Sequence, residues 1–320
     1  MAKRRKFFPL MLIAGTFFLL ALSGCSTYPS GDRNFGPTEE ASPSVSGGET
    51  KQTVPFTELI SHAVETNRNA PMLQKFWFSG WVSNTVEKRK TTSMYSGVMI
   101  LPHGYYVDAR MAGTPYRYYK WDEYNFLWTE RDDWMRAGED QFPLDPFLGF
   151  DWWMPALDRA VSLPDEEILN HPTKVFELKL SGEEMASLLQ QPFFPAEVAK
   201  LSTTPEWKNL LKQTEATATF WIGDDTYTKE EVAAQAKKAG KGEGEAALAE
   251  WVKENRLTWD EKGKVYHQNP IYQFNVLIEA PVPKAGYMNQ EIFFRFYHYN
   301  DPAIKIQTPE EILKYVENEK

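Results

Sequence analysis

Five histidines and two pairs of adjacent aspartates are the side chains that could bind a metal or move a proton in this chain. They are His62, His103, His171, His267 and His298, and the pairs Asp132-Asp133 and Asp224-Asp225. The histidines lack the short spacing that zinc ligands share, and paired aspartates are typical of turns. The sequence contains no Gly-x-Ser-x-Gly elbow, no His-Glu-x-x-His helix and no phosphate-binding loop. It therefore predicts a protein that is not an enzyme and that uses no metal and no cofactor.

The single cysteine, Cys25, offers a different chemistry. It follows the basic run Lys3–Lys6 and the apolar run Phe7–Leu20, an arrangement typical of a signal peptide. The tetrad Leu22-Ser23-Gly24-Cys25 resembles the lipobox of bacterial lipoproteins, which implies cleavage after residues 1–24 and lipidation of Cys25. We then expect a lipid anchor on the extracytoplasmic face of the cell membrane. An ordinary secretory signal or an N-terminal membrane helix is the alternative, although the apolar run is short for a span.

Composition separates the remaining chain into a tether and a folded part. Residues 25–53 are rich in Ser, Gly, Pro, Thr and Glu, which predicts a flexible tether. Residues 54–320 hold nearly all the aromatic residues outside the signal, and aromatic residues make up 14% of the chain. The net charge of −9 becomes −13 once the four basic residues of the signal are lost. An acidic chain disfavours nucleic acid as a partner and disfavours adsorption onto anionic lipid.

The folded part begins with one helix and a series of short strands. Apolar residues at helical spacing predict an amphipathic helix over Phe56–Ala70, closed by Pro71. β-branched and aromatic runs separated by turn-forming residues predict an antiparallel meander between Phe76 and Arg136. The expected strands are 76–82, 94–100, 105–111, 116–121 and 125–129. Large apolar groups alternate imperfectly, so both faces of this sheet are expected to need a cover.

The rest of the chain supplies candidates for those covers. Residues Asp140–Leu163 are too rich in proline for a long helix and too apolar for a free loop, so we expect them to lie over the sheet. They would be either a loop packed as part of the core or a lid over a ligand cavity. Capping boxes at Ser181, Thr228 and Thr308 predict helix starts. Further strands are expected at 174–180, 216–222, 272–279 and 291–299. A polar, alanine-rich segment at about 225–265 predicts a surface insertion that is helical in two pieces.

This order of elements resembles the LolA/LolB-like lipoprotein superfamily, which includes the LppX/LprG lipoproteins and the RseB-type sensors. The resemblance is carried by the lipobox, by Thr217-Ala218-Thr219-Phe220-Trp221-Ile222-Gly223, and by the closing segment Phe294–Pro309. It implies an α+β fold in which a strongly curved, unclosed antiparallel sheet holds helices in its concave face. In that fold an apolar cavity for acyl chains would lie between the sheet and the helices. Gly80 and Gly97 stand where such curvature needs glycine, and simple strand weakening or close packing is the alternative.

The phase of the meander follows from Asp108 and Arg110, which should face water and so turn Val107 and Ala109 inward. The resulting cavity candidates are Phe76, Phe78, Val82, Met99, Val107, Met111, Tyr118, Trp152, Trp153 and Met154. A closed core built from the same positions is the alternative. Two functions follow: a lipoprotein that binds lipid or another hydrophobic ligand, or an interaction or sensor lipoprotein that binds an envelope protein and carries no lipid.

Overall fold

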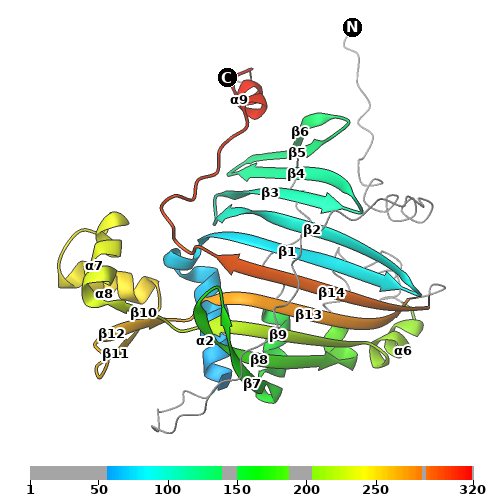
Figure 1. The fold of residues 1–320 in the computed structure, drawn as a ribbon, viewed down its shortest axis with the longest axis horizontal. Helices are drawn as coiled ribbons and strands as arrows, with labels where there is room; N and C mark the ends of the chain where they lie inside the picture. Colours follow the sequence, from blue (N-terminus) through cyan, green and yellow to red (C-terminus); the bar gives the residue numbers. More distant parts are fainter. Residues whose placement is uncertain (1–55, 139–149, 187–203, 283–285, 319–320) are drawn as a thin grey trace. The chain divides into compact units, whose positions relative to one another are not determined.

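The computed structural model describes residues 56–138, 150–186, 204–282 and 286–318 (Figure 1). Pro55–Lys320 form one compact unit. Its centre is an eleven-stranded antiparallel sheet that curves strongly and does not close, with helices in its concave face. The predicted α+β class and half-barrel architecture are therefore confirmed.

The sheet is built from two groups of strands, one from the N-terminal part and one from the C-terminal part of the folded chain. The first group is β1 (Lys75–Val86), β2 (Arg89–Ile100), β3 (Gly104–Met111), β4 (Thr114–Trp121), β5 (Tyr124–Thr129) and β6 (Asp133–Ala137). The remaining strands are β7 (Val161–Ile168), β8 (His171–Ser181), β9 (Glu215–Gly223), β13 (Ile271–Val282) and β14 (Gly286–Tyr297). Their spatial order is β6-β5-β4-β3-β2-β1-β14-β13-β9-β8-β7, so β14 joins the two halves by pairing with β1.

Register places one aromatic row across the middle of the concave face. Phe176, Phe220, Phe274 and Phe294 are successive partners on β8, β9, β13 and β14. All four side chains are buried, and the rings of Phe274 and Phe294 stack with centroids 5.6 Å apart. Because side chains alternate along a strand, this row commits every second residue of these strands to the core.

Gly80 continues the aromatic row onto β1, where no side chain fits. A Cβ atom at position 80 would lie 2.2 Å from the carbonyl oxygen of Phe293 and 2.6 Å from the ring of Phe294. At Gly97 on β2, a Cβ atom would lie 2.3 Å from the carbonyl oxygen of Tyr106. Both glycines are therefore required by close packing, the alternative that the sequence left open beside curvature.

The helices of the concave side begin with α2 (Phe56–Asn69), followed by the 3-10 helix η2 (Pro71–Leu73). Farther along the chain come α3 (Phe150–Trp153), η3 (Met154–Arg159), η4 (Gly182–Met185) and α6 (Glu206–Lys212). α2 packs Ile60, Ala63 and Val64 into the main core. The predicted capping box at Ser181 is present, with Glu184 as its acidic member.

The side chain of Asn67 fixes α2 to the sheet. It is fully buried; its amide Nδ2 donates to the carbonyl of Asn269, and its Oδ1 accepts from the backbone N–H of Ile271 and from the hydroxyl of Tyr299. A buried amide with this many partners tolerates few alternative arrangements. The position of α2 over β13 is therefore specified by hydrogen bonds as well as by apolar packing.

The convex face has its own cover over β3–β6. The C-terminal helix α9 (Glu310–Asn318) places the buried Ile312 against Tyr119, Phe126 and Trp134. The hydroxyls of Tyr119 and Thr308 are hydrogen-bonded at 2.8 Å. The sequence predicted α9 but did not place it on this face.

The segment around 225–265 forms a small layer beside the sheet (Figure 1). It comprises β10 (Asp225–Thr228), α7 (Lys229–Lys238), α8 (Glu245–Glu254), β11 (Thr258–Asp260) and β12 (Val265–Gln268). Both expected helices are present, and Thr228 caps α7 as predicted. The three-stranded sheet β10-β12-β11 was not predicted, because strands of three or four residues leave no alternation to read.

Two strands of the main sheet were also missed. β6 lies in the stretch interpreted as the end of the meander, and β7 begins inside the segment Asp140–Leu163 that was interpreted as a crossover. β7 contains Pro164 and the acidic run Asp165–Glu167, and its pairing with β8 is irregular between Leu163 and Glu166. These residues disfavour strands in general. Residues 139–149 of the crossover lie outside the described residues.

The packing at Gly80 yields a stability prediction. Gly80→Ala should lower the free energy of unfolding by about 1–3 kcal/mol, because the added methyl group meets backbone that cannot move aside. Gly138→Ala is the matched control, since a Cβ atom at Gly138 meets nothing within 4 Å, and its effect should stay within about 0.5 kcal/mol. Urea denaturation measures both, and equal effects would contradict the close approach.

Candidate functional site

The predicted cavity residues that the structure describes gather on one side of the sheet. Phe76, Phe78, Val82, Met99, Val107, Tyr118 and Trp153 belong to the main core, and Met111 and Met154 pack against it. The side chain of Trp152 lies outside the described residues. Asp108 and Arg110 are exposed while Val107 and Ala109 are buried, so the phase predicted for the meander is correct.

One half of this concave face is packed by helices. The contacts that the described helices make with the sheet are concentrated on β8, β9 and β13. There the ring of Phe150 from α3 lies edge-on to Phe220 and Phe274, with centroids 5.5 and 5.4 Å apart. Trp153 from the same helix is buried. In this half the described side chains of α3 and of the sheet pack directly against each other.

The other half, over β2–β5, is equally apolar. We call it the β2–β5 surface, and it consists of Tyr95, Met99, Val107, Ala109, Met111, Tyr116, Tyr118 and Leu127. Tyr95, Met99, Val107, Ala109 and Tyr118 are buried, whereas Met111, Tyr116 and Leu127 toward β5 are partly exposed. The apolar surface therefore runs from the helix-packed half to positions that reach solvent.

The two buried tyrosines of the β2–β5 surface add hydroxyl groups without adding charge. The Tyr118 hydroxyl lies 3.9 Å from the sulfur of Met111, a weak acceptor. Burial raises the pKa of Tyr118 well above its usual value, and burial also raises the pKa of Tyr95, against a smaller opposing effect of the Ser93 side chain. Both phenols are thus neutral at physiological pH, and the surface can meet an apolar molecule without burying a charge.

Four members of this surface were not among the predicted cavity residues. Tyr95, Ala109 and Tyr116 are register partners in one row, and Leu127 pairs with Tyr118 in the next. Strand alternation from Val107 gives all of them once the hairpin registers are known. The sequence indicated the strands but not the pairing, and that pairing is what brings these residues together.

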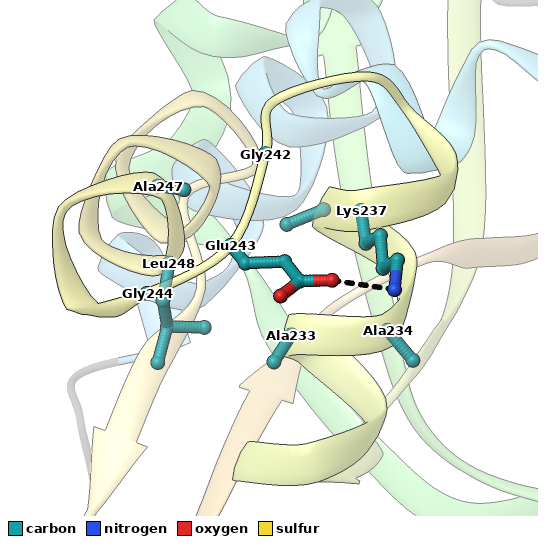
Figure 2. Close-up of a pocket in the computed structure, with 9 residues that line it drawn as sticks. Ala233, Ala234, Lys237, Gly242, Glu243, Gly244, Ala247 and Leu248 are labelled. Atoms are coloured by element: carbon teal, nitrogen blue, oxygen red, sulfur yellow. Dashed lines mark ion pairs between the residues drawn. The ribbon is translucent and has the colours of Figure 1, made fainter.

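A pocket of about 240 Å³ lies elsewhere, between α7 and α8 (Figure 2). Its lining is mostly small and apolar, with Ala233, Ala236, Ala247 and Leu248 as contributors. Lys237 and Glu243 form an ion pair of 2.5 Å at its side. The pocket belongs to the insertion, whose core is centred on Val232, Leu248 and Trp251.

A partly buried polar cluster joins the insertion to the main sheet. The hydroxyl of Tyr272 on β13 donates to the carboxylate of Asp225, at 2.7 Å from its Oδ2, and lies 2.9 Å from Nδ1 of His171 on β8. The rings of His171 and Tyr272 stack with centroids 4.3 Å apart. Burial raises the pKa of Asp225, which the hydrogen bond from Tyr272 and the nearby His171 partly oppose.

These contacts revise the interpretation of the histidines and acid pairs. His171 pairs with Asp225, and His267 lies 2.7 Å from Asp224 on the same insertion. Each pair brings together residues far apart in sequence, so no local spacing could indicate it. Within the described ranges, no group of three or more His, Cys, Asp or Glu is placed to hold a metal ion. Among the same residues no helix is long and apolar enough to cross a membrane.

Several solved structures align with most of this chain at low sequence identity. Lipoprotein LppX from Mycobacterium tuberculosis is 9% identical over 79% of this chain and 98% of its own, with a TM-score of 0.36. LprF from Mycobacterium bovis is 10% identical over 79% of this chain and 96% of its own, with a TM-score of 0.37. A LolA superfamily protein from Nitrosomonas europaea is 7% identical over 81% and 97%, with a TM-score of 0.25.

All three identities are 10% or lower, and all three TM-scores are below 0.5. The chain matches no family model and no curated protein.

The largely buried carboxylate of Asp225 gives the unfolding equilibrium a pH dependence. Its pKa is higher in the folded than in the unfolded chain, so its stabilising contribution is complete below the unfolded value of about 3.9 and is lost as pH rises through the folded value. The difference in unfolding free energy between the wild type and Asp225→Asn should therefore fall as pH rises above about 4. Urea titrations at a series of pH values measure it, and a difference that rises with pH would refute the burial effect.

Proposed function

We propose that this protein is a lipid-anchored extracytoplasmic lipoprotein that binds lipid or another hydrophobic ligand on the β2–β5 surface. The observation that carries the proposal is the continuation of the apolar concave face beyond the part packed by the described helices. This surface would bind a ligand by burying the apolar parts of that ligand, because its side chains are aliphatic, thioether and neutral phenol groups. No reaction is required of it.

Burial alone is sufficient for affinity. Each methylene group removed from water contributes about 0.8 kcal/mol, so an acyl chain of about a dozen carbons gains on the order of 10 kcal/mol before the costs of association. Met99 and Met111 support such binding because thioether side chains adapt to ligands of different shape. The partly exposed residues Met111, Tyr116 and Leu127 lie where a ligand would enter.

The anchor in this proposal is Cys25. Residues 1–24 would be the signal peptide, residues 25–53 would carry the lipid and the tether, and residues 54–320 would form the binding domain with the insertion at about 225–265. The proposal rests on the lipobox tetrad and on the composition of the tether. Two acyl chains on one cysteine are enough for stable attachment.

A second candidate function is binding of an envelope protein without lipid cargo. The observation that favours it is the insertion, which has its own apolar core and the 240 Å³ pocket between α7 and α8 (Figure 2). A pocket of this size fits one or two apolar side chains of a partner. Deletion of the insertion should then abolish binding of that partner and leave the ligand content unchanged.

The ligand proposal is tested at Ala109, a small residue between Tyr95 and Tyr116 on the β2–β5 surface. Ala109→Trp should fill the ligand space, so native mass spectrometry of protein purified from its own membrane should find ligand on the wild type and little on the variant. The unfolding free energy of the ligand-free variant should stay within about 1 kcal/mol of the ligand-free wild type.

The opposite result identifies a closed core. If protein side chains already fill this space, Ala109→Trp overpacks it and should cost about 1–3 kcal/mol, with no ligand on either protein. Arg110→Trp is the matched control, because Arg110 is the exposed neighbour on the opposite face of β3. It should alter neither ligand content nor stability.

The anchor is tested at Cys25. Cells grown with a labelled fatty acid should incorporate it into the wild-type protein, and Cys25→Ser should abolish the labelling because the chain has no other thiol. Ser26→Ala is the control and should be labelled like the wild type. Label retained by Cys25→Ser would show that the tetrad is not the acylation site.

A further inference from the structure

The convex face over β1, β2 and β14 carries apolar side chains that no described element covers fully. We call these the convex aromatic patch, and its members are Trp77, Trp81, Met94, Phe293 and Tyr297. Trp77 is 38% exposed and Met94 is 59% exposed, and the other three are half-buried. Trp81 and Phe293 stack on each other with centroids 3.9 Å apart. The patch is thus a preassembled group of large side chains facing solvent.

The patch occupies the middle of the sheet. β1 and β14 are the sixth and seventh of its eleven strands, so they lie midway between its two edges (Figure 1). On a curved sheet that position is the crest of the convex side. α9 covers this side only over β3–β6. A convex body meets a flat surface first at its crest, and here the crest carries two tryptophans and a tyrosine.

The charge of this face differs from that of the chain. On the three strands of the patch, the convex positions include three basic residues, Lys75, Lys90 and Arg295, and one acidic residue, Glu291. The flanking strands β3 and β13 add one basic residue, Arg110, and two acidic residues, Asp108 and Glu279. Asp108 is paired with Arg117. The crest is therefore weakly basic on a chain whose net charge is −9.

We propose that the convex aromatic patch rests on the surface of the membrane to which the chain is anchored. This inference rests on the proposed anchor at Cys25. Tryptophan and tyrosine favour the boundary between headgroups and acyl chains, where their rings are apolar and their polar atoms stay wet. Lysine and arginine beside them suit lipid phosphates. The acidic net charge of the chain disfavours adsorption onto anionic lipid in general, but the residues on this face are weakly basic.

The tether favours the same occupant. Thirty residues separate Cys25 from Phe56 at the start of α2, and a flexible chain of that length spans roughly 30 Å. The bilayer is thus present at high effective concentration, and even weak contact by the patch becomes frequent. The membrane is the one partner that the proposed anchor keeps within reach at all times.

The test uses the chain from Ser26 onward, which includes the whole compact unit with its cores and has neither the anchor nor a cysteine. Met94→Cys then carries a single environment-sensitive fluorophore on the patch, and Ala234→Cys on the exposed side of α7 is the control. Phosphatidylcholine vesicles, with and without a minority of phosphatidylglycerol, are the probe. We expect the label at position 94 to report an apolar environment and the label at 234 to stay unchanged.

Two variants separate the contributions. Replacing both Trp77 and Trp81 with serine should weaken binding to either vesicle by about tenfold or more, because apolar burial is lost. Lys90→Gln should weaken it by about fivefold on the anionic vesicles only. Circular dichroism checks that the variants are folded.

Failure has a clear form. No change at position 94, or vesicle binding that the tryptophan variant leaves intact, would overturn the inference and leave a protein partner as the occupant of the patch. The truncated chain that begins at Ser26 lacks the anchor, and ligand content is measured separately by mass spectrometry. These outcomes are therefore distinguishable from failure of the proposed function.

Discussion

The main sheet has apolar side chains on both faces, and each face has to be shielded from water. The placement of the helices follows from this requirement. The concave face receives α2, α3 and the 3-10 helices, and the buried Asn67 fixes α2 in place with hydrogen bonds to three residues, Asn269, Ile271 and Tyr299. The convex face receives α9 over β3–β6. α6 packs Leu210 and Leu211 into the main core as well, so each described helix outside the insertion contributes to covering the sheet.

The two remaining surfaces differ in kind. The β2–β5 surface is concave, uncharged and grades from buried to partly exposed residues, which suits a flexible apolar molecule. The convex aromatic patch mixes rings with basic residues and faces outward, which suits a boundary between water and lipid. Neither surface needs a reactive group. Asp225 and His171 contact each other and Tyr272, and these contacts join the insertion to the main sheet.

The fold could be predicted largely from the sequence, because most strands are runs of β-branched and aromatic residues bounded by turn-forming residues. Asp108 and Arg110 alternating with Val107 and Ala109 gave both the strand and its phase, and Thr228 and Glu231 marked the start of α7. β7 could not be predicted, because Pro164 and three acidic residues contradict its strand state and only pairing with β8 imposes it. The candidate site was predicted in part: alternation selected Met99 and Val107, but Tyr95 and Tyr116 join them only through hairpin register, which no single strand encodes.

The open ends of the sheet have one more consequence. An unclosed sheet leaves two strands with unpaired backbone groups, and such edges are templates on which further chains can add. At β7 the proline, the acidic run Asp165–Glu167 and the irregular pairing with β8 interrupt the row of free donors and acceptors. The residues that prevented β7 from being predicted as a strand thus also make this edge unsuitable for the addition of another chain. A molecule with apolar side chains on both faces of its sheet is thereby kept from polymerising along this edge.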